Sequence, residues 1–209
     1  MSGVFGPSEF QAASGASPSQ MADMLAYRAL LEDWNGRMNL VGPSALDSFW
    51  LRHAWDSAQL RLIAPEARVW ADIGAGAGLP GVVLAVFLKD APDAQVHLIE
   101  SMAKRCRFLS EVVEQLSLPA TVHNARGEDV VINGVEIVTA RACAPMTRLL
   151  GFAEPLLQRG ARGLFLKGRD AAAELVEARK AWKRLTMTTL SSRSDPEGNI
   201  VMVEATSRG

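Results

Sequence analysis

The fold is decided by the stretch VWADIGAGAGLPG, residues 69–81. Its apolar run at 69–73 predicts a short buried strand, and a helix is expected to begin near Gly81. Between them, closely spaced glycines let the backbone turn tightly and bring its N–H groups near a ligand. A strand, a glycine-rich loop and a helix in this order predict a ligand-binding turn in an α/β sheet.

Strands and helices alternate along the chain after Pro65. Further strands are predicted at 95–100, 118–124, 134–140, 162–168, 184–190 and 199–205, and helices at 81–88, 102–116, 144–157 and 170–182. Such alternation is typical of a parallel sheet with helices on both faces. The last two strands have no helix between them, so they must pair antiparallel. We therefore expect a doubly wound sheet that ends in an antiparallel hairpin.

The residues before the sheet divide into two parts. Residues 1–20 are rich in Ser, Ala, Gly and Pro and are expected to form a mobile arm. Apolar residues then recur at helical spacing over 21–37 and 45–62, which predicts two amphipathic helices. Residues 21–64 are thus expected to form an N-terminal helical cap, and residues 65–209 the sheet domain.

Composition excludes some classes of protein. The chain has 209 residues, of which 48% are hydrophobic, with 22 Lys and Arg against 23 Asp and Glu. These values exclude disorder of the whole chain and argue against indiscriminate coating of nucleic acid. Residues 1–100 carry 6 basic and 11 acidic side chains, whereas 101–209 carry 16 basic and 12 acidic. One basic face could therefore meet a polyanion, although scattered surface charge explains the same count.

The two cysteines, Cys106 and Cys143, lie far apart and have no histidine pair nearby. Neither a disulfide framework nor a metal site is expected from this pattern. The chain shows no signal peptide and no run of 18 apolar residues, so no membrane association is expected. We expect a cytoplasmic, reduced, monomeric protein.

Two glycine fingerprints overlap in the loop. Gly76, Gly78 and Gly81 fit the dinucleotide pattern GxGxxG. Gly74, Gly76 and Gly78 fit GxGxG, the form usual in enzymes that bind S-adenosylmethionine. The glycines alone do not decide between these two ligands.

Carboxylates near the predicted strand ends favour S-adenosylmethionine. Asp72 stands two residues before the first loop glycine, where a carboxylate suits an ammonium group and would repel a pyrophosphate. Glu100 ends the second strand and can accept hydrogen bonds from both ribose hydroxyls, a feature shared with NAD enzymes. Glu128 and Asp129 follow the third strand, near the expected position of an adenine amino group.

The fourth strand ends in TARACAP, residues 139–145, which has no DPPY-like or NPPY-like segment. Methylation of an exocyclic amine is therefore not favoured. Cys143 is a conceivable nucleophile for attack on C5 of a pyrimidine, with Arg141 lowering the thiol pKa. A small cysteine that lines the core is the simpler interpretation.

Cations follow several of the predicted strands. They are Lys104, Arg105, Arg107, Arg126, Arg141, Arg148, Lys167 and Arg169. Because the carboxyl ends of the strands line the ligand crevice, several of these side chains are expected at one edge of the sheet. A solvated helix face is the alternative for Arg105, whereas the positions of Arg141 and Lys167 favour function.

In the predicted cap, His53 and Asp56 are spaced to meet on one helical turn, with Ser57 beside them. A catalytic dyad is one interpretation. A histidine that packs against the carboxylate and joins the cap to the core is the other.

Several motifs together point to one family. They are WNGRMNL (34–40), RHAWDS (52–57), DIGAGAGLPG (72–81), LIESMAKRCRFL (98–109), TARACAP (139–145) and LKG (166–168). In this order they resemble the RsmG family, also called GidB, over residues 25–205. That family comprises small-subunit ribosomal RNA methyltransferases that act on guanine N7.

The resemblance implies a seven-stranded, Rossmann-like class I methyltransferase fold over residues 65–209, with S-adenosylmethionine as methyl donor. It implies donor contacts at Gly74, Leu79, Gly127, Glu128 and Arg141, beside Asp72, Gly76, Gly78 and Glu100 from the loop pattern. The RNA-binding candidates are Lys104, Arg105, Arg141 and Lys167. The partner would be 16S ribosomal RNA or the 30S subunit.

No catalytic residue is required under this interpretation, because guanine N7 carries a free lone pair and loses no proton. The lack of an obvious acid or base also fits a non-catalytic protein that binds S-adenosylmethionine and serves ribosome assembly or regulation. A small-molecule methyltransferase is a weaker third alternative, disfavoured by the basic second half.

Overall fold

Strand β1 (Val69–Ile73) lies inside a seven-stranded sheet with the order β3-β2-β1-β4-β5-β7-β6. The computed structural model describes residues 5–205. The other strands are β2 (Gln95–Glu100), β3 (Ala120–Asn124), β4 (Ile137–Arg141), β5 (Arg162–Lys167), β6 (Leu185–Ser191) and β7 (Asn199–Ala205). Strand β7 pairs antiparallel with β5 and β6, and the remaining pairs are parallel. The predicted doubly wound sheet with a terminal hairpin is confirmed.

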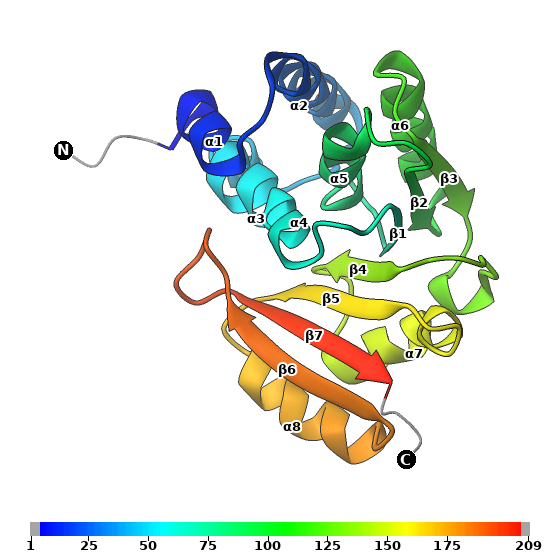
Figure 1. Ribbon diagram of the computed structural model, residues 1–209. Helices are drawn as coiled ribbons and strands as arrows, with labels where there is room; N and C mark the ends of the chain where they lie inside the picture. The colour runs from blue at the N-terminus through cyan, green and yellow to red at the C-terminus, as the bar shows by residue number, and fades with distance from the viewer. Residues whose placement is uncertain (1–4, 206–209) are drawn as a thin grey trace.

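Helices cover both faces of the sheet (Figure 1). Helices α5 (Gly81–Leu88) and α6 (Ala103–Gln115) lie on one face, together with the N-terminal helices, and α7 (Met146–Leu157) and α8 (Ala171–Ala181) lie on the other. Each face has its own buried apolar cluster. Almost every side of α5 is buried, because it lies between the sheet and the cap. No helix within residues 5–205 is long and apolar enough to cross a membrane.

The N-terminal segments are more varied than the sequence predicts. They are α1 (Pro7–Ser14), α2 (Pro18–Met38), η1 (Pro43–Ala45), η2 (Phe49–Trp55), α3 (Asp56–Ala58) and α4 (Leu60–Ile63). The single helix predicted at 45–62 is wrong, because η2 is π-helical and short segments flank it. Phe49, Trp50 and Trp55 are all buried, although a regular α-helix would spread them around its axis.

The mobile arm predicted at 1–20 is also wrong wherever the structure describes it; residues 1–4 lie outside the described part. Phe10 of α1 is fully buried, with its ring centroid 5.4 Å from that of Trp50 and 6.2 Å from that of Phe87. The Ser17 side chain caps α2, while Gln20 returns a bond to the Ser17 N–H. The Ser and Pro residues of this segment start helices, whereas its composition alone suggests a mobile arm.

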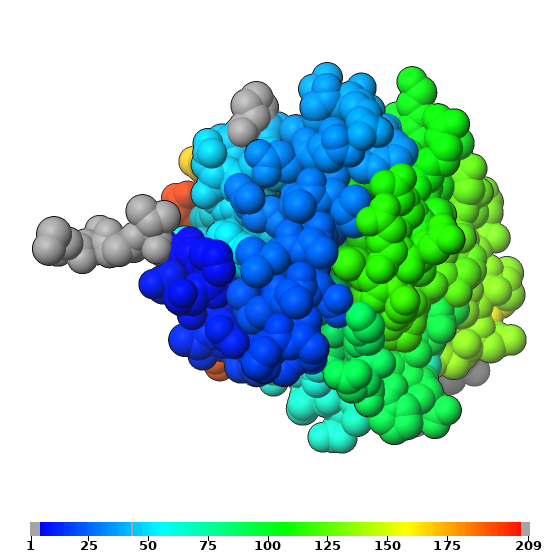
Figure 2. Space-filling view, turned by 90° about the horizontal axis from the view of Figure 1, so that it is seen from above, coloured from blue at the N-terminus to red at the C-terminus, as the bar shows by residue number. Residues whose placement is uncertain are grey.

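The cap shares its core with the sheet domain. Met24, Tyr27 and Leu31 of α2 belong to the same buried cluster as Val82 of α5 and Phe108 of α6. The space-filling view shows α2 lying directly against α6 (Figure 2). The boundary predicted between cap and sheet domain at residue 65 remains a prediction. The buried apolar cluster continues across it among the described residues.

The packing of α1 can be tested by truncating Phe10. We expect Phe10→Ala to lower the free energy of unfolding by about 3–5 kcal/mol, because it empties a fully buried aromatic site. Urea denaturation measures this loss. The control is Ser8→Ala on the exposed face of the same helix, which should change stability by less than about 0.5 kcal/mol. Equal stability of the two variants would show that α1 is not packed.

Candidate functional site

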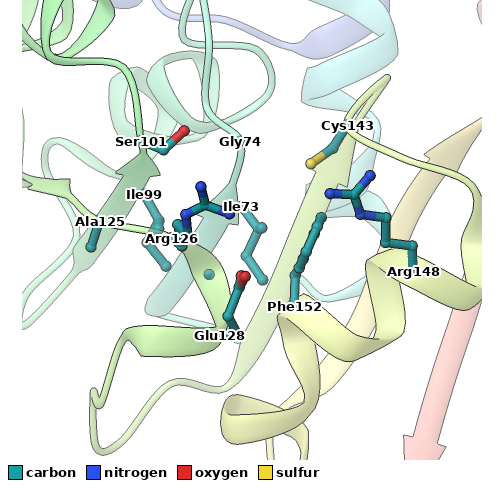
Figure 3. Close-up of a pocket in the computed structure, with 11 residues that line it drawn as sticks. Ile73, Gly74, Ile99, Ser101, Ala125, Arg126, Glu128, Cys143, Arg148 and Phe152 are labelled. Carbon is teal, nitrogen blue, oxygen red and sulfur yellow. The ribbon is translucent and has the colours of Figure 1, made fainter.

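A pocket of about 200 Å³ opens at the carboxyl ends of β1, β2, β3 and β4 (Figure 3). We call it the glycine pocket; it is lined by Ile73, Gly74, Ile99, Ser101, Ala125, Arg126, Gly127, Glu128, Cys143, Arg148 and Phe152. It lies beside the β1–β4 pair, where the strand order reverses direction. Open α/β sheets bind ligands at this position, so the pocket is the candidate cofactor site.

Two glycines form a cradle that side chains would fill. A Cβ on Gly74, whose φ is +70°, would stand 2.7 Å from Cys143 Sγ. A Cβ on Gly127 would stand 2.9 Å from Ile73 Cγ2. Both glycines and Glu128, the donor contacts that the family resemblance implies, line the pocket, and their contact with the donor stays a prediction. Backbone that a ligand can approach closely, with no side chain in the way, fits the donor implied by the GxGxG pattern.

The other loop residues shape the turn and do not line the pocket. Gly76 and Gly78 have φ values of +55° and +92°, and a Cβ on Gly78 would meet Val82 at 2.5 Å. Leu79 is buried and precedes a cis peptide bond to Pro80. These three residues therefore affect the donor site through the path of the loop backbone. Their predicted contacts with the donor stay predictions.

Glu100 braces the loop. Its Oε2 accepts the N–H of Gly76 at 3.0 Å, and its Oε1 accepts the N–H of Met102 at 2.8 Å. Arg105 lies 3.7 Å from the same carboxylate, which is only 4% exposed. A carboxylate has about four lone-pair sites, so these bonds leave acceptor capacity for a ribose hydroxyl.

Asp72 lies beneath the loop, outside the pocket lining. Its Oδ2 accepts the N–H of Gly81 at 2.8 Å, whereas Oδ1 is buried without a partner among the described residues. Burial raises the pKa of Asp72 to about 7, with the Glu100 charge adding to the effect and the Gly81 bond and Arg141 opposing it. An orphaned buried carboxylate oxygen beside a ligand loop suits a cationic group of the ligand.

Two arginines flank the glycine pocket from opposite sides (Figure 3). The Arg148 guanidinium lies 5.3 Å from the centre of the Phe152 ring, and Arg126 follows β3. The sequence places both among the strand-end cations but does not single them out. The sequence analysis also misses Ile99 and Phe152, which form apolar walls of the pocket. The position of Ile99 near the end of β2 could have indicated that it lies at the ligand-binding edge of the sheet.

Cys143 is a poor nucleophile. Burial raises the pKa of its thiol, and the charges of Asp72 and Glu100 raise it further. The predicted lowering by Arg141 is therefore wrong, because the carboxylates and desolvation outweigh the nearby cations. Cys106 is buried, and its thiol donates to the Glu100 carbonyl at 3.1 Å.

Arg141 extends back toward the cap instead of into the glycine pocket. Its guanidinium donates to the Arg52 carbonyl at 2.7 Å and to His53 Nδ1, and lies 3.6 Å from Asp56. Burial, followed by the Arg141 charge, lowers the pKa of His53 to about 4, so the ring is neutral and can accept this bond. The predicted His53–Asp56 bond is not the one formed.

Asp56 instead binds the loop between β6 and β7. Its Oδ1 accepts hydroxyl hydrogen bonds from Ser192 at 3.1 Å and Ser194 at 2.5 Å. Arg52 reaches the same loop through Asp195, at 2.6 Å. The cap is thus joined both to the end of β4 and to the terminal hairpin.

Arg141 belongs to a second pocket of about 320 Å³, which we call the polar pocket. It is lined by Arg52, His53, Asp56, Arg141, Ala142, Leu166, Lys167, Gly168, Asp170, Glu174, Asp195 and Gly198. Lys167 donates to the Ala144 carbonyl at 2.9 Å and pairs with Glu174 at 2.7 Å. The two pockets are neighbours, because consecutive residues Ala142 and Cys143 line one each.

The strand-end cations therefore do not form one free basic edge. Arg141 and Lys167 are paired inside the polar pocket, Arg126 and Arg148 flank the glycine pocket, and Lys104 is exposed on α6. Within residues 5–205 no group of three or more His, Cys, Asp or Glu side chains is placed to hold a metal ion.

Comparison with known proteins identifies the family. The sequence profile of GidB, described as rRNA small subunit methyltransferase G, matches residues 20–200. The ribosomal RNA small subunit methyltransferase G of Caulobacter vibrioides (strain NA1000 / CB15N) is 59% identical over 95% of this chain and 91% of its own length. That of Bradyrhizobium sp. (strain BTAi1 / ATCC BAA-1182) is 48% identical over 87% and 83%.

Solved structures share the fold at low sequence identity. A putative O-methyltransferase from Klebsiella pneumoniae has a TM-score of 0.61 at 15% identity and covers 92% of this chain and 91% of its own. A SAM-dependent methyltransferase from Aquifex aeolicus has a TM-score of 0.57 at 14% identity, over 84% and 97%. The chain therefore belongs to the GidB family and is an S-adenosylmethionine-dependent methyltransferase with a Rossmann-like fold.

Proposed function

We propose that this enzyme transfers the methyl group of S-adenosylmethionine to N7 of a guanine in 16S ribosomal RNA, without a general base. The observation that carries the proposal is the chemistry of the glycine pocket. Its ionisable side chains are two guanidinium groups, one carboxylate and one thiol with a raised pKa. The pocket thus offers neither a histidine nor an activated thiol as a general base, and the free lone pair of N7 needs none.

We infer the substrate from the names of the relatives. The Caulobacter and Bradyrhizobium proteins are both named ribosomal RNA small subunit methyltransferase G. We assign the same substrate to this chain, as free 16S ribosomal RNA or within the 30S subunit. Such a substrate implies a cytoplasmic enzyme, which we expect to act as a monomer.

The glycine pocket would hold the donor. The backbone of Gly74 and Gly127 would approach it closely, and Glu128 would accept a hydrogen bond from the adenine amino group. Glu100 would use its remaining lone pairs for the ribose, and the unpaired Oδ1 of Asp72 would attract the ammonium group. When bound, S-adenosylmethionine supplies an electrophilic methyl group on its sulfonium.

The polar pocket would bind the RNA substrate near the target guanine. Arg141 and Lys167 lie there, next to the segment that borders the glycine pocket. Lys104 and Arg105 lie on α6, where Lys104 is exposed and Arg105 is half-buried beside Glu100, and both would contact flanking phosphates. A guanine must leave its stack to enter, and holding N7 in line with the methyl group supplies several kcal/mol, up to roughly 7–11 in ideal cases.

Positive charge develops on guanine as the methyl group arrives. The carboxylates that face the two pockets would stabilise this charge, because fixed negative groups act strongly in a water-poor site. The residues of this chain therefore orient the base, exclude water and compensate charge. None of them has to exchange a proton with the substrate.

The proposed reaction is tested by methyl transfer. Purified enzyme and methyl-labelled donor should label 30S subunits or their RNA, and mass spectrometry of the digest should find the label in N7-methylguanosine. Transcripts in which 7-deazaguanosine replaces guanosine lack the N7 atom and should take up no label. Label on a ribose or an exocyclic amine would contradict the N7 assignment, and intact donor binding without any transfer would favour the non-catalytic assembly role.

The donor cradle is tested by a matched pair of glycine variants. Gly74→Ala places a Cβ 2.7 Å from Cys143 Sγ, whereas Gly134→Ala has a similar positive φ and meets nothing within 4 Å. Both variants should lose about 1–2 kcal/mol of stability through backbone strain. Calorimetry should show donor affinity at least about tenfold weaker in Gly74→Ala and unchanged in Gly134→Ala. Equal affinities would place the donor elsewhere.

The role of Asp72 is tested by pH. Its pKa of about 7 means that a proton competes with an ammonium ligand below that pH. Lowering pH from 7.5 to 6 should weaken S-adenosylmethionine binding about eightfold, while 5′-methylthioadenosine, which has no ammonium group, should bind equally at both. Asp72→Asn should remove the pH dependence. An unchanged pH profile in Asp72→Asn would exclude the carboxylate as its source.

A further inference from the structure

A hydrogen bond joins the cap to the glycine loop. The hydroxyl of Tyr27, in α2, donates to the carbonyl of Ala77 at 2.6 Å, across 50 positions of sequence. Tyr27 is fully buried, and its ring makes an edge contact with Phe49 at 5.8 Å. Among residues 5–205 this is the one hydrogen bond between the cap and residues 74–80.

The loop is built to meet this hydroxyl. A Cβ on Gly78 would lie 3.1 Å from the Tyr27 oxygen, so the close approach of loop and ring depends on glycine. Burial raises the pKa of Tyr27, and the hydroxyl therefore stays protonated and can only donate to the carbonyl. Without it, the Ala77 carbonyl would be buried without a partner, which is costly.

The remaining loop groups show what the bond controls. The N–H groups of Gly74 and Ala75 go to the Ile99 carbonyl, that of Gly76 goes to Glu100, and that of Gly78 goes to the Ala75 carbonyl. This leaves the N–H groups of Ala77 and Leu79 without an acceptor in the described part of the chain. The carbonyl that Tyr27 holds lies between these two amides in the sequence. That carbonyl and the Gly78 N–H form one peptide group, which the Tyr27 and Ala75 bonds hold at both ends. Loss of the Tyr27 bond would loosen the backbone dihedral angles of Ala77 and Gly78, and these angles orient the two neighbouring amides.

We propose that Tyr27 is a positioning residue for the methyl donor. By fixing the Ala77 carbonyl, it keeps the Ala77 and Leu79 N–H groups free of internal acceptors, in the same loop as the pocket-lining Gly74, for the carboxylate of the donor's amino-acid part. A carboxylate is the acceptor that such free backbone N–H groups bind most strongly. The inference depends on the donor and not on the methylated base, so it can fail or hold independently of the guanine assignment.

The test compares two ligands in the absence of RNA. S-adenosylhomocysteine has the amino-acid carboxylate, and 5′-methylthioadenosine lacks it. In Tyr27→Phe, which removes only the hydroxyl, the Kd for S-adenosylhomocysteine should rise about tenfold. The Kd for 5′-methylthioadenosine should change less than about twofold. Equal changes for the two ligands, or no change for either, would overturn the proposal.

A control separates positioning from general loosening of the cap. Phe49→Leu disturbs the same aromatic contact but leaves the hydroxyl in place. It should lower Tm and leave the ratio of the two Kd values as in the wild type. A ratio shifted as far as in Tyr27→Phe would reduce Tyr27 to a structural role.

A second measurement uses the wild-type protein and does not depend on how any variant folds. Hydrogen exchange at the amides of Ala77 and Leu79 should slow when S-adenosylhomocysteine binds. It should not slow when 5′-methylthioadenosine binds. Protection by both ligands, or by neither, would contradict the assigned role of these amides.

Discussion

The architecture of the site depends on one buried hydrogen bond, from the Gly81 N–H to the Asp72 carboxylate. This bond ties the end of β1 to the start of α5 at 2.8 Å, so residues 74–80 must close into a loop above it. The junction is tightly packed, because a Cβ on Gly81 would lie 2.3 Å from Leu98 Cδ2 and 2.7 Å from Asp72 Oδ2. Burying a carboxylate for this purpose is costly, and the same burial raises the pKa of Asp72. The loop, the glycine pocket and the contact with the cap all follow from this junction.

The sheet could be predicted because its signals are local. Most of the strands are short apolar runs, and the short connection of the final hairpin leaves no room for a crossover helix. The glycine loop was predictable for the same reason. The packing of Phe10 could not be predicted, because its partners Trp50 and Phe87 lie 40 and 77 positions away in the sequence. The composition around Phe10 suggested a mobile arm.

The direction of side chains at strand ends was the least predictable part of the site. Arg141 is the last residue of β4, close to the expected position, yet its guanidinium reaches the backbone of Arg52 in the cap. Sequence position fixes where the Cα of Arg141 lies, but the neutral His53 and the Asp56 carboxylate decide which way the long side chain runs. Glu100 is similar, since its carboxylate turns to the loop backbone and accepts the N–H of Gly76.

The joining of cap and hairpin has a consequence for synthesis on the ribosome. Asp56 finds its partners Ser192 and Ser194 at separations of 136 and 138 positions, and Arg52 finds Asp195. A nascent chain that has not yet released its last strands lacks all of these partners. The polar pocket is therefore assembled only once residues 192–195 have left the ribosome, and a chain that still lacks them beside ribosomal RNA would not yet carry the finished pocket.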